Sequence, residues 1–461
     1  MLKSWIRRSG IGSIIKTSRN FVSVCFNKRT LKLKLKSFIF KLRYFFTKID
    51  RASDQDVKKL HSMHKLAIEN NKKVVLMLSL FPFKNAKFGG QIRSNAAYQG
   101  YHKLGLVIPF IVRPIDWYVN ESIAIDEVVF PLISPYRLYG CAEYIPYSGD
   151  FLAGIFAKND PKVIKAIKRR IKFPVDIIHV EHPWLFPFVY KLKKEFAMTQ
   201  NATLIYSAQN IEWALNEQML NGSNLDQNII KKLVQDIREL ELFTINHADL
   251  VVTVSPADQA YLEQQTIKKV IYAPNATHKK IPDDNKVVSW KQRLPAKFFL
   301  FAGSDHPPNS IGLHTCLNGI DKNFTEEFKV VILGSVINSI NQYPLFSNSN
   351  FIKLGFVEPE DLAAIIFCAH AVLVPITIGG GTNLKTAEAL LSGKYVVATK
   401  FGMRGYEHYI GHEGVYVSES PSEFQNDMRK VWQLPKPSFE NFRAQDLTWE
   451  YSMQPLFRSI Q

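Results

Sequence analysis

The stretch PITIGGGTNLKTAEALLSG, from Pro375 to Gly393, places three glycines and a threonine between an apolar run and a helical pattern. Residues 371–375 predict a strand, and residues 383–392 predict a helix that ends before Gly393, a residue suited to that position. The N-terminus of a helix favours an anion, and glycines let a phosphate approach the backbone closely. We therefore predict a phosphate-binding loop at 379–382, with a tight structural turn as the alternative.

Two charged residues follow on the predicted helix. Lys385 and Glu388 are three positions apart, so both belong to one helix face. In a binding site, Lys385 would supply charge to a phosphate, and Glu388 would accept hydrogen bonds from sugar hydroxyls. The alternative is a surface salt bridge, which contributes little to stability.

Apolar runs of strand length recur along the rest of the chain, with helical stretches between them. Such runs are typical of parallel strands that are covered on both faces, and the alternation indicates βαβ units. The sequence therefore predicts an α/β protein with two doubly wound, Rossmann-like parallel-sheet domains that face a cleft. The predicted strands are 74–80, 106–112, 176–181, 203–208, 250–255 and 270–273 in the first domain, and 298–302, 329–333, 351–354, 371–375 and 395–399 in the second.

The same pattern sets the domain boundaries. We expect a basic N-terminal extension at 1–48, a first Rossmann-like domain at 72–280, a second at 297–435, and a C-terminal segment at 436–461. Residues 53–71 predict a helix that begins at a Ser/Asp pair. The polar stretch 277–296 is interpreted as the linker between the domains.

Composition fits a globular protein, with 46% hydrophobic and 21% charged residues in a chain of 461. The four cysteines are far apart and form no CxxC pair, which argues against a disulfide framework or a zinc site. This cysteine usage favours a reducing compartment, so we expect a cytoplasmic protein.

The N-terminal extension carries most of the net charge. Residues 1–48 hold 13 Lys or Arg and no acidic residue, whereas the whole chain has a net charge of +17. No apolar run there reaches the roughly 18 residues of a membrane span, but a basic segment with aromatic residues can lie in the headgroup region of an anionic membrane. We expect peripheral contact with an inner membrane surface; a solvated tail or a targeting peptide is the alternative. No nucleic-acid-binding motif accompanies the charge, so no nucleic-acid partner is expected.

The segment PITIGGGTNLKTAEALLSGKYVVATKFGMRGYE resembles the donor-binding segment of retaining glycosyltransferases of family 4 (glycosyltransferase group 1), which have the GT-B fold. Other stretches are similar to segments of that family in the same order. They are GGQIRSNAAYQGYHKLG (89–105), DIIHVEHPW (176–184), YSAQNIEW (206–213), ADLVVTVSPADQAYL (248–262), VIYAPNATH (270–278), FAGSDHPPNSIGL (301–313) and LTWEYSMQPLF (447–457).

The resemblance implies transfer of a sugar from a nucleotide diphosphate sugar to a hydroxyl of a glycan or lipid-linked acceptor, with retention and without a metal or cofactor. It implies a hexosyltransferase of polysaccharide biosynthesis whose first domain takes the acceptor and whose second takes the donor. The C-terminal segment would be a helix that crosses back to the first domain. The implied catalytic residues are His182, Glu181 and Lys385. The implied donor-binding residues are Gly89, Gly90, Arg93, Gly303, Ser304, Gly379, Gly380, Gly381, Thr382, Asn383, Lys385 and Glu388.

The sequence departs from the family pattern at two informative positions. Gly380 stands where many relatives have a first Glu, and Gln209 stands where they have a His. Two alternatives therefore stay open: an inactive GT-B protein that binds glycans or acts as a scaffold, and a nucleotide-sugar 2-epimerase of the same fold. A dinucleotide-dependent dehydrogenase is disfavoured, because no glycine loop fits G-x-G-x-x-G with an acidic residue about 20 positions later.

Overall fold

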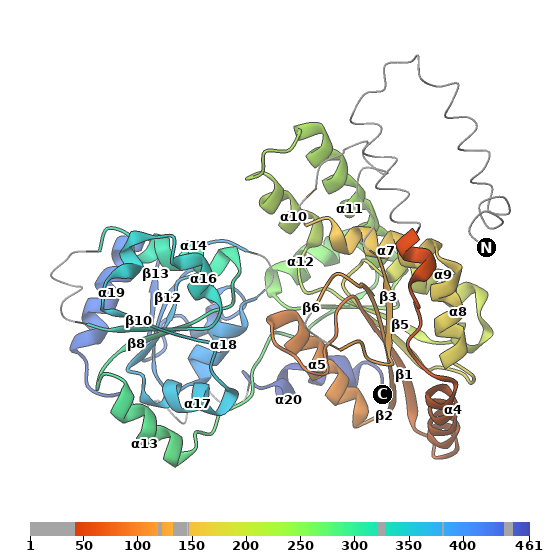
Figure 1. The fold of residues 1–461 in the computed structure, drawn as a ribbon, viewed down its shortest axis with the longest axis horizontal. Coiled ribbons are helices and arrows are strands. Elements are labelled where there is room, and N and C mark those ends of the chain that lie inside the picture. The colour runs from red at the N-terminus through yellow and green to blue at the C-terminus, as the bar shows by residue number, and fades with distance from the viewer. Residues whose placement is uncertain are drawn as a thin grey trace, which may run out of the picture.

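The computed structural model describes residues 42–118, 122–131, 145, 147–320, 328–379, 382–437 and 446–461. Two α/β domains lie side by side, each built on its own sheet (Figure 1). Neighbouring strands pair in parallel throughout both sheets. The predicted fold class, two doubly wound parallel-sheet domains, is therefore confirmed.

The sheet of the N-terminal domain has seven strands in the order β3-β2-β1-β4-β5-β6-β7. Apolar side chains on both faces of β1 are buried, because helices cover the sheet on each side. The strands are β1 Lys73–Ser79, β2 Gly105–Pro114, β3 Glu127–Phe130, β4 Ile177–Glu181, β5 Thr203–Ser207, β6 Leu250–Thr253 and β7 Lys269–Tyr272.

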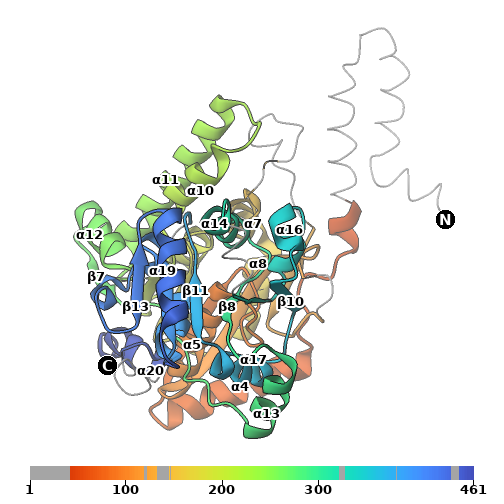
Figure 2. The same cartoon turned by 90° about the vertical axis from the view of Figure 1, so that its left-hand side faces the viewer.

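The sheet of the C-terminal domain has six strands in the order β10-β9-β8-β11-β12-β13. Figure 2 faces this domain and shows the strands running from β13 to β10 across the view. The strands are β8 Phe299–Ala302, β9 Val330–Leu333, β10 Phe351–Gly355, β11 Ala371–Val374, β12 Tyr395–Thr399 and β13 Val415–Ser418.

Helices connect the strands and cover both sheets. The helices of the first domain are α4 Asp54–Glu69, α5 Gly89–His102, α7 Gly149–Asn159, α8 Pro161–Arg170, α9 Phe186–Glu195, α10 Glu212–Leu220, α11 Gln227–His247 and α12 Pro256–Gln265, and residues 42–46 are also helical. Those that follow are α13 Asp284–Arg293, α14 Pro307–Leu317, α16 Val336–Ile340, α17 Pro359–Cys368, α18 Leu384–Leu391, α19 Pro421–Gln433, α20 Trp449–Ser452 and α21 Gln454–Arg458. Among these residues, no helix is both long and apolar enough to cross a membrane.

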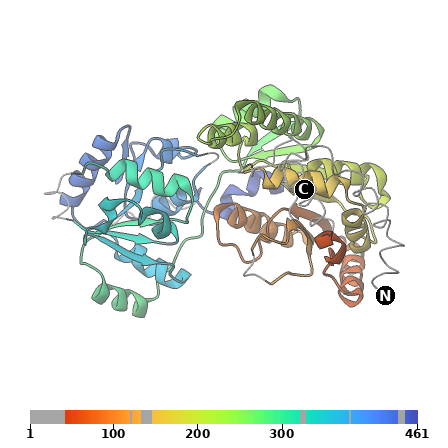
Figure 3. The same cartoon turned by 45° about the horizontal axis from the view of Figure 1, so that its top comes forward.

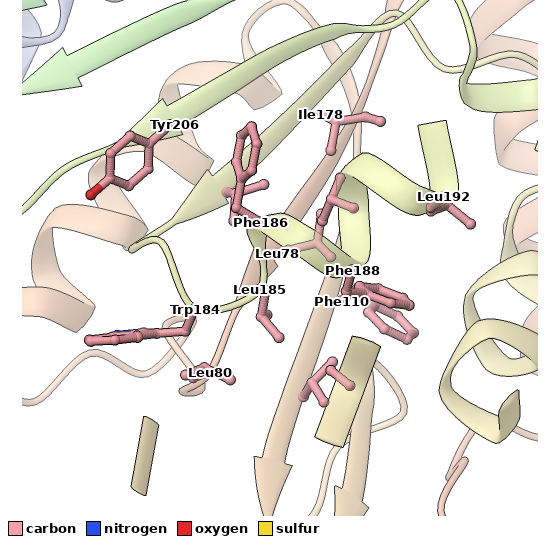
Figure 4. Close-up of a cluster of buried hydrophobic side chains, with 14 of the residues drawn as sticks. Leu78, Leu80, Phe110, Ile178, Trp184, Leu185, Phe186, Phe188, Leu192 and Tyr206 are labelled. Carbon is pink, nitrogen blue, oxygen red and sulfur yellow. The ribbon is translucent and has the colours of Figure 1, made fainter. Parts of the chain in front are cut away.

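A large apolar core holds the N-terminal domain together. Figure 4 shows Phe186 and Phe188 of α9 beside Leu78 of β1 and Ile178 of β4. All four side chains are almost fully buried, so each contributes about 1.5–3 kcal/mol to the free energy of folding through burial of apolar surface. This rigid layer fixes the carboxyl end of β4, where the candidate site begins.

The C-terminal segment belongs to the N-terminal domain in space. Trp449, Met453 and Leu456 are buried in the same cluster as Val75 of β1 and Tyr101 of α5. Figures 1 and 3 both place the C-terminus with that domain. Two short helices, α20 and α21, make this contact where the resemblance implied one helix; residues 438–445 lie outside the described part.

Three local predictions were incomplete. Residues 284–293 of the expected linker form α13, because Asp283 caps the helix and Val287 and Trp290 pack against α17. Strands β3 and β13, which lie at the edges of the two sheets, were not predicted. Helix α4 with Ser53 as its N-cap, and α18 between Asn383 and Gly393, agree closely with the predicted helices.

We predict that Gly312→Ala destabilises the C-terminal domain by about 1–3 kcal/mol, the usual cost of overpacking. A Cβ atom at Gly312 of α14 would lie 2.0 Å from the carbonyl oxygen of Pro375, a backbone atom at the end of β11. Thermal unfolding measures the effect. Gly222→Ala is the matched control, because a Cβ atom there meets no atom within 4 Å; equal melting temperatures for the two variants would contradict this packing.

Candidate active site

His182 follows β4 directly and has an unusual backbone conformation. Its φ is +61°, in the left-handed region that side chains other than glycine seldom adopt. Such strain persists where surrounding contacts enforce it, and it is frequent at functional sites. Here the His182 N–H donates to Ser207 at 3.1 Å, and its Nδ1 donates to Oε1 of Glu212 at 2.8 Å. The backbone and the imidazole are therefore both held in place.

His182 opens into a cavity of about 420 Å³ in the N-terminal domain. Aromatic rings form much of its wall, and polar groups come from the starts of α5, α7 and α10. The lining residues are Phe81, Phe88, Gly90, Trp117, Tyr118, Asp150, His182, Gln209 and Asn210. Apolar walls with a few convergent polar groups are typical of small-molecule sites. We call this cavity the His182 pocket.

Two ionisable groups of this pocket, His182 and Asp150, have shifted pKa values. Burial lowers the pKa of His182, but the hydrogen bond and charge of Glu212, with Glu181 and Asp150 nearby, raise it above its ordinary value overall. Burial raises the pKa of Asp150 to about 6, where the His182 charge opposes the rise and Glu212 adds to it. The imidazole is thus favoured as a cation, and the Asp150 carboxyl titrates near neutral pH, as suits proton transfer.

A buried carboxyl group on α11 supports Glu212 from behind. Glu241 accepts hydrogen bonds from the N–H groups of Glu212 and Trp213 at 3.1 and 3.4 Å, and from the hydroxyl of Tyr206 at 3.3 Å. These bonds fix the first turn of α10, which carries Glu212. Burial raises the pKa of Glu241 to about 8, and the negative charge of the nearby Glu212 is the second largest cause of the rise.

Glu181, predicted beside His182 as a catalytic residue, lies beneath the pocket. Its side chain is 1% exposed; it accepts from Nε2 of His179 at 3.0 Å and from Nε2 of Gln209 at 2.7 Å. Burial would raise its pKa, but the His179 bond, the Arg93 charge and the Gln209 bond hold the pKa at about 2. Both oxygens are engaged inside the protein, so Glu181 orients Gln209 and does not line the pocket.

The first glycine segment begins α5 and faces the other domain. A Cβ atom on Gly89 would lie 3.2 Å from Leu384, the first residue of α18, and one on Gly90 would lie 3.1 Å from Gln209. Arg93, expected to add charge to a phosphate, is instead 1% exposed. Its Nη1 donates to Oδ1 of Asn275 at 3.2 Å, because the guanidinium points toward the domain junction.

Asn275 joins both predicted binding segments. Its side-chain oxygen accepts from Arg93, and its side-chain amide donates to the carbonyl of Thr382 at 3.1 Å. Its backbone carbonyl accepts from the hydroxyl of Tyr406 at 2.8 Å. Arg93 comes from the N-terminal domain, whereas Thr382 and Tyr406 come from the C-terminal domain. The two glycine segments are thus held at one junction, beside the His182 pocket.

In the C-terminal domain, Lys385 is half-buried on the first turn of α18. Its ammonium donates to Oδ1 of Asn309 at 2.6 Å, and the Asn309 amide donates to the carbonyl of Ser304 at 2.8 Å. Burial lowers the pKa of Lys385 to about 8, and the charge of Glu388 opposes the fall. The Lys385 amine is desolvated and, among the described residues, has only a neutral amide as its hydrogen-bond partner. An anion that binds beside it would therefore stabilise the positive charge of the amine. Gly303, by contrast, is buried under Phe301 and Val336.

The triple-glycine loop is described in part. Gly379 has a φ of +130°, which only glycine adopts readily, and its carbonyl accepts from Nη1 of Arg404 at 3.2 Å. Gly380 and Gly381 lie outside the described residues. Thr382 is 9% exposed, and its hydroxyl oxygen is buried without a hydrogen-bond partner in the described structure. Asn383, expected to bind the donor, caps α18 by accepting from the Lys385 N–H at 3.1 Å.

Glu388 forms an ion pair with Lys280, in the chain that joins the domains. Both side chains are about one-quarter exposed, so the pair borders solvent. The alternative of a surface salt bridge with Lys385 is therefore not the contact that Glu388 makes. Its carboxylate remains accessible to a ligand that approaches α18.

Sequence reasoning missed several residues of this site. Asp150 follows a stretch without any recognisable motif, and Asn309 stands in FAGSDHPPNSIGL, where only Gly303 and Ser304 were predicted to bind the donor. Asn275 stands in VIYAPNATH, a stretch from which no site residue was predicted. Each of these residues acts through partners far away in sequence, so no local pattern reveals it.

We predict that Glu212→Gln lowers the pKa of His182 by about 1 unit or more, because the variant removes the adjacent negative charge. A pH titration of the His182 ring followed by NMR measures the change. Glu217→Gln is the matched control, since Glu217 is an exposed carboxylate on the same helix. A His182 titration that is the same in both variants would exclude Glu212 as the group that holds the imidazole charged.

Comparison with known proteins connects this geometry to a fold family. Residues 296–433 match the family model described as Glycosyl transferases group 1. A comparison with curated proteins finds no match. Among solved structures, sucrose-phosphate synthase from Thermosynechococcus elongatus is 16% identical with a TM-score of 0.60, and the match covers 84% of this chain and 99% of that chain.

Two further structures extend the likeness. Anabaena HepE, solved in complex with UDP, is 15% identical with a TM-score of 0.56 and the match covers 84% and 99% of the two chains. WaaG, a glycosyltransferase involved in lipopolysaccharide biosynthesis, is 13% identical with a TM-score of 0.53 and coverage of 84% and 97%. The chain therefore has the GT-B fold, with a C-terminal domain that is similar to glycosyl transferases of group 1.

Proposed function

We propose that this protein is a retaining glycosyltransferase that moves a sugar from a nucleotide diphosphate sugar to a hydroxyl of a glycan or lipid-linked acceptor. The observation that carries the proposal is the meeting of two sites at the domain junction. Gly89 at the start of α5 faces Leu384 at the start of α18, where a Cβ atom on Gly89 would lie 3.2 Å away, and Gly90 lines the His182 pocket. A donor held on α18 therefore reaches the pocket from the other domain.

The donor diphosphate is assigned to the N-terminus of α18. This helix end offers backbone N–H groups and the positive end of the helix dipole. Lys385, whose pKa is lowered to about 8, adds a positive charge there. The structure of HepE with UDP supports a nucleoside diphosphate as the class of ligand. Glu388, one turn further on, takes the hydroxyls of the nucleotide ribose.

The reacting sugar and the acceptor are assigned to the His182 pocket. Phe81, Phe88 and Trp117 offer flat apolar surfaces to sugar rings, and Asp150 accepts hydrogen bonds from hydroxyl groups. His182, held as a cation by Glu212, presents Nε2–H to the same space. It therefore orients the sugar or stabilises negative charge that develops as the glycosidic bond to phosphate breaks.

Two alternatives predict different products. An inactive glycan-binding protein releases no nucleoside diphosphate from any donor, and a 2-epimerase converts the nucleotide sugar without an acceptor. A panel of nucleotide sugars, assayed with and without saccharide acceptors, separates the three. Our proposal requires nucleoside diphosphate release that depends on acceptor, with the anomeric configuration of the product retained when it is read by NMR.

We predict that Lys385→Ala lowers kcat about 100-fold or more, the usual effect of removing one group that stabilises transition-state charge. Affinity for the nucleoside diphosphate should fall far less, because the charge on the leaving diphosphate grows as the bond breaks. Steady-state kinetics and calorimetry measure the two effects. Lys400→Ala, which removes an exposed lysine of the same domain, is the control. A loss of affinity as large as the loss of kcat would contradict a role in the transition state.

We predict that Glu388→Ala weakens nucleoside diphosphate binding by about 1.5–3 kcal/mol, the range for hydrogen bonds to a charged group. Lys280→Ala is the matched control, because it breaks the same ion pair while keeping the carboxylate. Calorimetry should show a loss of affinity in the first variant alone. An equal loss in both would mean that the ion pair acts structurally, and no loss in either would remove Glu388 from the site.

A further inference from the structure

Residues 42–48 are fixed to the N-terminal domain. The hydroxyl of Tyr44 donates to Asp160, and its ring lies 5.9 Å from the ring of Phe156. Lys162 of α8 lies over the same ring, with Nζ 4.2 Å from the centroid. Arg43 forms an ion pair with Asp116 at 2.5 Å. The segment, drawn red beside α7 in Figure 1, is therefore held against the folded body.

This anchored segment leaves two phenylalanines in solvent. Phe45 is 70% exposed and Phe46 is 76% exposed, although their neighbour Tyr44 is packed. The two rings contact each other edge to face, with centroids 5.2 Å apart. Exposed aromatic rings are costly in water unless another surface covers them, and adjacent ones mark an interaction site.

A basic cavity of about 480 Å³ is lined from Thr47 onward, the residue that follows Phe46 in the chain. Its cationic lining residues are Lys48, Lys162, Lys165 and Arg169. The cavity also contains Asp50 and Asp54, but Arg169 pairs with both at 2.9 and 2.6 Å, and Arg170 pairs with Asp50 at 2.6 Å. The acidic groups are thus neutralised locally, so the three lysines set the sign of this surface.

We propose that Phe45, Phe46, Lys48, Lys162 and Lys165 form a docking surface for an anionic lipid bilayer. Phenylalanine rings insert at the level of the headgroups, and lysines there bind lipid phosphates. Each such lysine strengthens binding by about fivefold, which corresponds to the usual contribution of a basic residue near an anionic membrane. The surface belongs to the folded domain, so it is separate from any contact made by residues 1–41.

The docking surface is connected to the His182 pocket. Asp116, the partner of Arg43, precedes Trp117, which lines that pocket. The ring of Trp117 would lie 2.8 Å from a Cβ atom on Gly149, the neighbour of Asp150. Docking would therefore bring the pocket close to the membrane, where a lipid-linked acceptor would enter it; this consequence for the acceptor rests on the proposed function, whereas membrane binding does not.

Co-sedimentation of the full chain with vesicles tests the proposal. Vesicles of phosphatidylcholine with phosphatidylglycerol should bind the protein, and vesicles of phosphatidylcholine alone should bind it at least tenfold more weakly. The double variant Phe45→Ser/Phe46→Ser and the double variant Lys162→Glu/Lys165→Glu should each lower binding to the anionic vesicles by about tenfold or more. Acceptor-independent properties, such as nucleoside diphosphate affinity, should not change, so failure here is distinct from failure of the proposed function.

Matched controls come from other surfaces of the chain. Phe356→Ser removes a phenylalanine that is 78% exposed in the C-terminal domain, and Lys103→Glu/Lys231→Glu reverses two exposed lysines elsewhere. These controls should bind anionic vesicles as the unchanged protein does. Unchanged binding in both test variants would overturn the proposal and assign the membrane contact to residues 1–41. A loss as large in the controls would also overturn it, since binding would then follow total charge or hydrophobicity.

Discussion

The buried amide of Asn275 is the contact on which the arrangement of the two domains depends. The Asn275 side chain, which is 8% exposed, links Arg93 on α5 to Thr382 beside α18, while the backbone carbonyl of Asn275 accepts from Tyr406. A buried amide that loses a partner costs about 1–3 kcal/mol, so loss of either side-chain partner of Asn275 would destabilise this junction by about that amount. The guanidinium of Arg93 takes part because burial, opposed by the charge of Glu181, lowers its pKa to only about 10 and leaves it charged.

Charge in the N-terminal half of the site is organised in layers. Glu181 is kept ionised beneath the pocket by His179 and Arg93, and Glu212 keeps the imidazole of His182 charged at its wall. Glu241 lies behind Glu212, where burial and that neighbouring charge favour its neutral form. Two buried carboxylates this close repel each other, so protonation of Glu241 relieves the repulsion that its charge would exert on Glu212. The strained backbone at His182 is tolerated because hydrogen bonds hold both of its ends.

The sequence was informative where local pattern and structure share a cause. The run before Gly379 is a strand and the run after Thr382 is a helix, because strand, glycine loop and amphipathic helix each follow from adjacent residues. The two doubly wound parallel-sheet domains followed from repetition of that unit, and the resemblance to a known family identified their arrangement as GT-B. Helix α13 was mistaken for linker because its polar residues outnumber Val287 and Trp290, the two that pack.

The site was harder to predict than the fold because its key contacts join distant residues. Lys385 and Glu388 were expected to act together on one face, yet Lys385 reaches Asn309 and Glu388 reaches Lys280. Likewise, Asp150 enters the His182 pocket from α7, after a stretch that carries no motif. Sequence spacing limits which residues can touch along one helix, but it does not decide which tertiary partner a flexible charged side chain prefers.

The Lys280–Glu388 ion pair gives the donor helix a link to the chain that joins the domains. A carboxylate has two oxygens and about four lone-pair sites, so Glu388 can keep Lys280 on one oxygen while the other accepts from a ribose. Lys280 follows Asn275 by only five residues. The short stretch that contains both residues therefore contacts the donor helix, through Lys280, and forms the junction between the domains, through Asn275. Ligand binding that favours one arrangement of this stretch also favours one relative position of the two domains.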